Sequence, residues 1–127
     1  MKIRIQSQIQ FDDQLEVMDQ YYEGEWKEKG DYCYLLYVNE EGEKVVLKFH
    51  DQELTMTRFS TPKSIMKFMA SEKGHALIPT PLGMQQFVTD TKEYALEQNK
   101  LGLSYQLFTA DESQQFATYR LELTWED

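Results

Sequence analysis

Side chains able to act as a nucleophile or a base are few in this chain, and they are scattered. Cys33 is the only thiol among 127 residues, and it stands in the run Tyr32–Val38, which is apolar at alternate positions of both phases. A thiol in such a run is expected to be buried, which raises its pKa and makes it inert. His50 shares an alternation face with Lys48 and is expected to point to water, whereas His75 follows a glycine turn. Nothing near His75 in the sequence has metal-ligand spacing.

Acid–base and cofactor sites are equally hard to assemble from this sequence. The paired carboxylates Asp12-Asp13 and Glu40-Glu41 fall in turns, where neighbouring acids are solvated and diverge, so we do not expect them to form an acid/base pair. The two histidines could still meet in space, and one of them could ligate a haem. We predict no catalytic residue, no metal ligand and no cofactor, and an enzyme is the class of protein that we favour least.

Arg58 is the most informative single charge. It alternates in phase with Leu54 and Met56, whereas threonines and Phe59 occupy the other phase, so either face of this segment could point inward. A buried arginine must be paired, because an unpaired charge away from water is very costly. Arg58 could therefore grip a ligand carboxylate or phosphate through two hydrogen bonds. The alternative is a structural role, as an internal ion pair or stacked on a tryptophan, Trp26 or Trp125.

The aromatic content is the other unusual feature, at 13% of the chain with eight tyrosines. A tyrosine has an apolar ring and a polar tip, which suits a pocket for a moderately polar organic molecule. It suits a packed core or a protein interface equally well. The residues that we expect to line a ligand site are Arg58, Trp26, Tyr34, Tyr37, Met56 and Tyr105.

Alternation of apolar and polar residues indicates which elements must position these side chains. Ile3, Ile5 and Ile9 alternate with lysine, arginine and glutamine, and the same period of two returns in 45–49, 101–107 and 117–125. That period is typical of half-buried antiparallel strands. Turn signals rich in glycine, proline, asparagine and aspartate recur between the segments. We expect about nine strands, near residues 2–11, 14–27, 31–39, 43–50, 53–59, 64–72, 75–80, 84–96 and 100–110, and a further one near 115–126.

Long strands joined by sequential hairpins tend to close on themselves, because an open sheet leaves two exposed edges. We therefore predict one domain, residues 1–127, that folds as an all-β, antiparallel, up-and-down barrel of about eight to ten strands. A two-sheet sandwich is the alternative, but it usually needs long crossover connections that this evenly punctuated chain lacks. Within segment 64–71, Ile65, Met66, Phe68 and Met69 have helical spacing, so a short helix competes there with the strand that we prefer.

One strand is expected to bend. Between Leu15 and Trp26 the apolar residues change phase, from Leu15 and Val17 to Tyr22 and Trp26, and Gly24 stands between the two aromatic residues. A strand that changes face around a glycine usually contains a bulge or a sharp bend, which is how a barrel turns a corner. We therefore predict a corner at Gly24.

Segments spread over nearly the whole chain match those of a known family in order and spacing. They are Tyr34–Glu41, Leu54–Arg58, Thr80-Pro81-Leu82-Gly83, Phe87–Thr91 and Gly102–Leu107. Together they resemble the YwiB-like family of small Gram-positive bacterial proteins, which has no assigned function. The resemblance implies a calycin-like barrel and supplies no catalytic residue. The chain departs from the family after Arg58, where Phe59-Ser60 replaces an expected small residue and glycine.

Calycins include the lipocalins, which carry a Gly-x-Trp string near the start of the barrel. Gly24-Glu25-Trp26 matches this string, but it falls on the second predicted strand, whereas the lipocalin string belongs to the first. The plainer interpretation is a bulge glycine beside a core aromatic residue.

The charge balance excludes two classes of partner. Thirteen lysines and arginines stand against 22 aspartates and glutamates, which leaves a net charge of -9. Such a field repels phosphate backbones and anionic lipid headgroups, so we expect neither nucleic acid nor a membrane as a partner. The first residues alternate and do not form the apolar stretch of a signal peptide, and the single cysteine excludes an internal disulfide. We therefore expect a cytoplasmic protein.

Three functions remain in competition. The first is a non-enzymatic barrel that binds a small apolar or amphipathic molecule, with Arg58 as an anionic anchor. The second is a filled barrel that acts as a structural or protein-interaction module, or that forms a homodimer. An enzyme of small-molecule metabolism is the third and weakest, because strands use nearly all of the chain and leave few long loops for catalysis.

Overall fold

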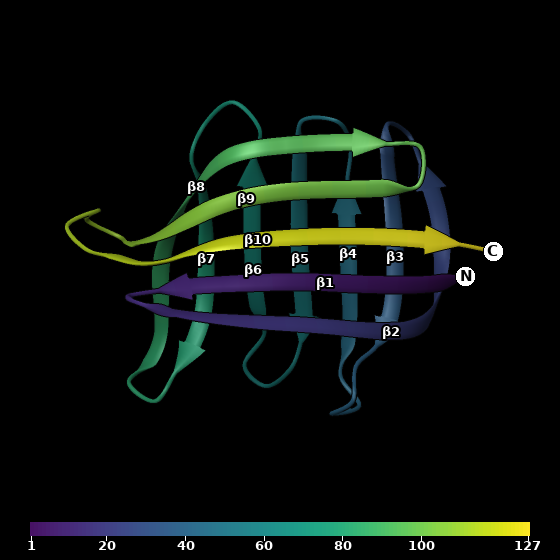
Figure 1. The fold of residues 1–127 in the computed structure, drawn as a ribbon. Coiled ribbons are helices and arrows are strands. Elements are labelled where there is room, and N and C mark those ends of the chain that lie inside the picture. The colour runs from purple at the N-terminus through teal and green to yellow at the C-terminus, as the bar shows by residue number, and fades with distance from the viewer.

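The protein folds into ten antiparallel strands that close into a barrel (Figure 1). This computed structural model describes residues 1–127. Each strand pairs with its neighbours in sequence, and the first pairs with the last, so the predicted up-and-down barrel is confirmed. The strands are β1 (Lys2–Phe11), β2 (Gln14–Lys29), β3 (Tyr32–Val38), β4 (Lys44–Phe49), β5 (Glu53–Phe59), β6 (Ser64–Met69), β7 (Gly74–Thr80), β8 (Gly83–Glu97), β9 (Lys100–Thr109) and β10 (Gln115–Glu126).

The sequence allowed either a strand or a short helix in segment 64–71, and the structure has a strand there. Residues Ser64–Met69 form β6, which pairs with β5 through six residues and with β7 through Ile65 and Met66. Phe68 is fully buried, whereas Lys67 is exposed. The ladder to β5 stabilises the extended form over the short helix because it satisfies the backbone of the whole segment. No helix in the structure is long and apolar enough to span a membrane.

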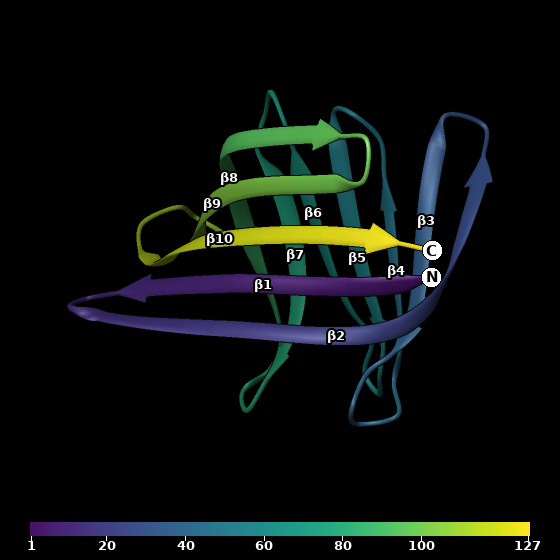
Figure 2. The same ribbon diagram turned by 45° about the vertical axis from the view of Figure 1, so that its right-hand side comes forward.

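The barrel is flattened into two layers whose strands cross. Strands β1, β9 and β10 run across β3–β7, which lie behind them (Figures 1 and 2). Two long strands belong to both layers. The first ten residues of β2 pair with β1 and residues 24–29 pair with β3, while β8 pairs first with β7 and then with β9. The N- and C-termini lie side by side at one end.

The inward face of alternating positions forms the core. A cluster of fourteen buried residues fills the barrel, and Leu35, Leu47, Leu54 and Leu123 within it are fully buried. Burying one such side chain is worth about 1.5–3 kcal/mol relative to leaving it in water. A smaller cluster of Ala76, Phe87 and Leu107 lies beside the main one.

The predicted corner in β2 lies at Gly24, where the strand leaves β1 for β3. A Cβ atom there would overlap the Leu36 carbonyl oxygen and the Ile3 side chain, so only glycine fits. The strand does not change face, however. Tyr22 and Trp26 pack against the core, and the pairing on either side of the bend shows no register shift. The change of phase in the sequence instead reflects apolar residues on the outer face, among them Val17, which is 62% exposed.

Candidate functional site

A pocket of about 330 Å³ opens at the end of the barrel where β2 passes the ends of β3–β7. We call it the mouth pocket. Its apolar wall consists of Tyr37 and Val45, which are almost fully buried, and of the part-buried Met56, Met66 and Ile78. These side chains come from β3, β4, β5, β6 and β7, so most of one layer contributes a residue to the wall.

Polar groups surround the opening of the mouth pocket. Gln20 and Tyr22 come from β2, Asn39 and Glu40 from the turn after β3, and Arg58 from the end of β5. An apolar wall with a polar rim is the arrangement found in sites for small amphipathic molecules.

Tyr22 joins the two layers at this rim. Its hydroxyl donates a 2.7 Å hydrogen bond to Glu40 Oε2 and lies 2.9 Å from the side-chain amide of Gln20. Its ring stacks on Tyr37, with 4.4 Å between ring centroids. Burial, and then the hydrogen bond to Glu40, raise the pKa of Tyr22 well above the ordinary tyrosine value, and the same bond lowers the pKa of Glu40. The ring and the hydroxyl together close one side of the pocket.

Arg58 has the inward phase of Leu54 and Met56, but it lies at the end of the strand, where the barrel opens. Its side chain is 45% exposed, and its nearest acidic partner is Glu43, with 3.8 Å between Nε and Oε1. No hydrogen bond holds its guanidinium group. The possibility that Arg58 is buried inside the barrel is therefore wrong. Its side chain is partly exposed because β5 ends where solvent enters the mouth pocket. The guanidinium remains available to an anion.

Tyr37 contributes a hydroxyl group to the otherwise apolar wall of the mouth pocket. Burial raises the pKa of Tyr37 to about 12, the charge of Glu40 adds to the shift, and the charge of Arg58 opposes it. Arg58 therefore acts on the same region of the pocket as the Tyr37 hydroxyl. Tyr37, Met56 and Arg58 are the three expected ligand-site residues that the structure brings together.

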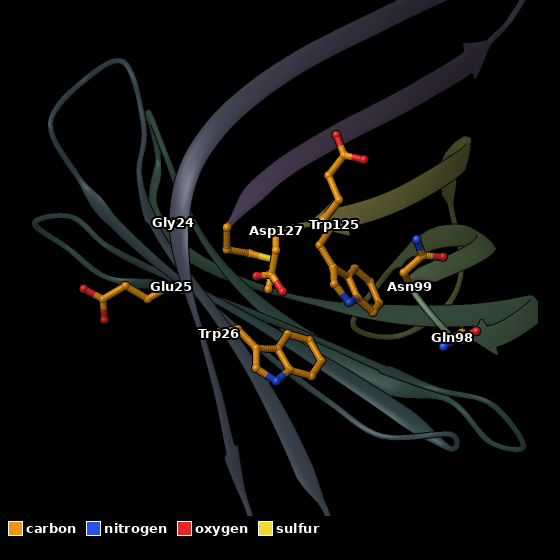
Figure 3. A pocket seen from close by; sticks show the side chains of 9 residues that line it. Gly24, Glu25, Trp26, Gln98, Asn99, Trp125 and Asp127 are labelled. Carbon is orange, nitrogen blue, oxygen red and sulfur yellow. The ribbon is translucent and has the colours of Figure 1, made fainter.

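The other three expected residues lie elsewhere. Trp26 lines a wide hollow of about 820 Å³ beside the chain termini, where it stacks on Trp125 with ring centroids 5.5 Å apart (Figure 3). Tyr105 is buried in the core between the rings of Phe68 and Tyr119. Tyr34 lies on the outer face of β3, where it pairs with Lys27 and Lys48.

The tryptophan hollow differs in chemistry from the mouth pocket. Trp125 is only 7% exposed and both indole rings pack on Phe49, so the tryptophans belong to the core at this end. The Trp26 indole N–H donates to Glu28, at 3.2 Å. Figure 3 shows the two indoles side by side, with Glu25 turned away from them. The Gly24-Glu25-Trp26 string thus contains the core aromatic residue that its plainer interpretation expects, but the glycine lies at a corner without a bulge.

A second group of ionisable side chains surrounds Glu53, which is only 12% exposed. Tyr32 donates a 2.5 Å hydrogen bond to its carboxylate, and Lys67 Nζ lies 3.4 Å from it. His50 directs Nε2 towards Glu53 at 3.5 Å, while its Nδ1 accepts a hydrogen bond from the backbone N–H of Gln52. The hydrogen bond to Nδ1 ties the His50 ring to the turn between β4 and β5, so this group holds the turn together.

Sequence reasoning missed several residues of the mouth pocket. Met66 and Ile78 were not expected at a ligand site, because nothing in a single strand indicates which end of it faces an opening. Tyr22 stood out in the sequence only at the change of phase around Gly24, whereas in the structure its ring stacks on Tyr37. No group of three or more His, Cys, Asp or Glu side chains is arranged to hold a metal ion.

Comparison with known proteins gives a family and a fold. A family model described as a domain of unknown function (DUF1934) matches residues 3–123. The structure is similar to the crystal structure of the ywiB protein from Bacillus subtilis, with a TM-score of 0.71, 19% sequence identity, and coverage of 99% of this chain and 91% of that one. No curated protein sequence matches the chain. At this identity the structural likeness concerns the fold alone.

Proposed function

The chain belongs to the DUF1934 family of domains of unknown function, and we propose that it is a non-enzymatic cytoplasmic barrel that binds one small amphipathic molecule in the mouth pocket. The expected resemblance to the YwiB-like family is confirmed by the family match and by the ywiB fold. The family carries no assigned activity, so the proposal rests on the geometry of the pocket.

The observation that carries the proposal is the position of Arg58 over an apolar wall. Its guanidinium makes no hydrogen bond and lies 3.8 Å from its only acidic partner, while Tyr37, Val45 and Met56 line the same pocket. A ligand with an anionic head and an apolar body would satisfy both parts, since a guanidinium binds carboxylate or phosphate through two hydrogen bonds. The volume of about 330 Å³ lies at the small end of the range for ligand pockets, about 300–1,000 Å³.

The charge of the protein restricts the ligand further. With a net charge of -9, the surface repels anions at long range. Arg58 is the only basic residue that lines the mouth pocket. We therefore expect a ligand with one anionic group and a compact apolar body, and we do not expect a polyphosphate.

The test uses two probes of equal chain length, decanoate and decanol, titrated by calorimetry. Both should bind, because the apolar wall serves both, and decanoate should bind more tightly. Arg58→Ala should weaken decanoate binding about tenfold, which corresponds to about 1.4 kcal/mol, and leave decanol binding unchanged.

Arg120→Ala is a matched control. The Arg120 side chain lies on the outer face of β10, is 51% exposed and lies 3.8 Å from Glu93. The substitution therefore removes the same charge from a similar environment away from the pocket. The proposal is wrong if neither probe binds, or if Arg120→Ala weakens decanoate binding as much as Arg58→Ala does.

A further inference from the structure

The first part of β2 is an unpaired sheet edge. Residues 14–23 pair with β1 on one side, and β3 joins β2 only from Gly24 onward. The Gly24 N–H donates to the Met1 carbonyl at 2.9 Å, and the β1–β2 register has no shift. Because backbone groups of successive residues face opposite sides of a strand, the even-numbered residues of β2 face β1. The N–H and C=O groups of Leu15, Val17, Asp19 and Tyr21 therefore point to the open side.

The other unpaired edge of the barrel is interrupted by a bulge and a lysine, whereas this one is regular and its only charged side chains are the acids Glu16, Asp19 and Glu23. Residues 90–97 of β8 pair only with β9, and there the strand carries a β-bulge between Thr91 and Glu93, with Lys92 at the bulge. Bulges, lysines and prolines are the usual means of preventing edge-to-edge pairing. Residues 14–23 contain no lysine and no proline, and their register is regular.

Apolar side chains accompany the open backbone groups. Leu15, Val17 and Tyr21 lie on the outer face of β2 and are 57%, 62% and 59% exposed. Their neighbours on β1 are polar, since Leu15 and Val17 pair with Gln10 and Gln8. An apolar row beside unsatisfied backbone donors and acceptors is the arrangement of a strand that pairs with another strand.

We propose that a second copy of this chain pairs with this edge, β2 against β2, antiparallel and about a two-fold axis. A two-fold axis places identical surfaces against each other, so the segment must be complementary to itself. Centring the axis on Met18 achieves this. Leu15 then lies opposite the partner's Tyr21, Glu16 opposite the partner's Gln20, and Met18 opposite the partner's Met18.

Neighbouring registers are worse. Moving the centre to Asp19 or to Glu16 places two like charges directly opposite each other, which is destabilising. Moving it to Val17 sets Leu15 against the partner's Asp19 and loses both apolar pairs of leucine with tyrosine. Only the register centred on Met18 makes two such pairs on the outer face and opposes no like charges.

Pairing in this register also reaches the mouth pocket. Met18 lies on the inner face of β2 and lines that pocket. In Figure 1, β2 is the lowest strand of the front layer, and the ends of β3–β7 extend below it. A partner strand would continue the front layer downward and place the partner's Met18 at the pocket rim. The dimer would thus narrow the opening that the single chain leaves.

The test places single cysteines at neighbouring positions in a Cys33→Ser background. Met18 would face its own copy as a non-hydrogen-bonded pair, whose Cα atoms are about 4.5 Å apart, within the range that a disulfide spans. Met18→Cys should therefore form a covalent dimer on mild oxidation. Val17→Cys, one residue away and more exposed, should not, because Val17 lies opposite the partner's Asp19. Cross-linking of Val17→Cys at least as well as Met18→Cys would overturn the register.

Sedimentation equilibrium of the unmodified chain tests the dimer itself. We expect a dimer that strengthens with salt, because each copy carries a net charge of -9. Val17→Pro should give a monomer whose unfolding midpoint equals that of wild type diluted until it is also monomeric, since the Val17 N–H points away from β1 and proline is tolerated on such an edge. A wild-type chain that stays monomeric at its highest soluble concentration in high salt, or a Val17→Pro chain that still dimerises, would overturn the proposal.

Discussion

The ring of Tyr22 stacks on the ring of Tyr37 across the rim of the mouth pocket, with centroids 4.4 Å apart and planes 26° from parallel. Tyr22 belongs to the crossing layer and Tyr37 to the layer behind it, and Gly24, which separates β2's two pairings, is paired with Tyr37. The corner at Gly24 thus sets the position of the ring that closes the pocket.

Removing the Tyr22 hydroxyl separates its hydrogen bonds from its stacking. Tyr22→Phe loses the bond to Glu40 but keeps the ring on Tyr37, so we expect the free energy of unfolding to fall by about 1 kcal/mol. Tyr21→Phe is the control, since the adjacent ring is 59% exposed on the outer face and should change stability by less than about 0.5 kcal/mol. Urea denaturation measures both, and equal losses would show that the Glu40 bond contributes nothing.

Removing Arg58 should barely affect folding. Its side chain is 45% exposed and 3.8 Å from Glu43, and exposed ion pairs of this kind contribute about 0–1 kcal/mol. We expect Arg58→Ala to change the free energy of unfolding by less than about 0.5 kcal/mol in the same denaturation experiment. A loss of about 3 kcal/mol or more would mean that Arg58 is a structural ion-pair partner and not a free anchor.

Most of the fold was predictable because alternation is a local signal. The period of two in β1, β4, β9 and β10 reports directly which side chains face the core, and the turn residues mark where each strand ends. The corner at Gly24 was predicted from a change of face that does not occur, since the change of phase comes from apolar residues on the outer face of β2. The extended form of β6 could not be predicted from local spacing alone. Its apolar residues have helical spacing, and the segment is a strand because its backbone pairs with the neighbouring strand β5.

The candidate site was predictable only in part, because a pocket depends on where strands end in space. Periodicity placed Met56 and Arg58 on one face, but it could not show that Arg58 passes the end of the closed wall. It also gave Trp26 and Tyr105 the same weight as Tyr37, although the first packs on Trp125 and the second lies deep in the core. Composition counts aromatic rings, whereas the barrel's tilt and register decide which of them reach solvent.

The corner itself can be tested by adding one methyl group. Gly24→Ala should destabilise the barrel by about 1–3 kcal/mol, because the new Cβ would overlap a backbone carbonyl oxygen that cannot move without disturbing β3. Gly102→Ala, on β9, meets nothing within 4 Å and should be neutral or slightly stabilising. Thermal unfolding compares the two, and equal melting temperatures would mean that β2 turns without close packing at Gly24.

The carboxylate of Glu53 should make stability depend on pH in one direction. The hydrogen bond from Tyr32, followed by the charge of Lys67, lowers the pKa of Glu53 below its ordinary value. A carboxyl whose pKa is lower in the folded chain stabilises it above the unfolded-state pKa of about 4.3, and this stabilisation is lost as the pH falls through the folded-state pKa.

Glu53→Gln should therefore be less stable than wild type near neutral pH, by about 1.5–3 kcal/mol for a hydrogen bond to a charged group. The difference between the two proteins should shrink as the pH falls below about 4, because wild type then also carries a neutral side chain. Glu72→Gln, in the exposed turn before β7, controls for the loss of one negative charge. Urea midpoints measured across this pH range decide the matter, because a difference that stays constant down to the lowest pH would assign the effect to shape and not to charge.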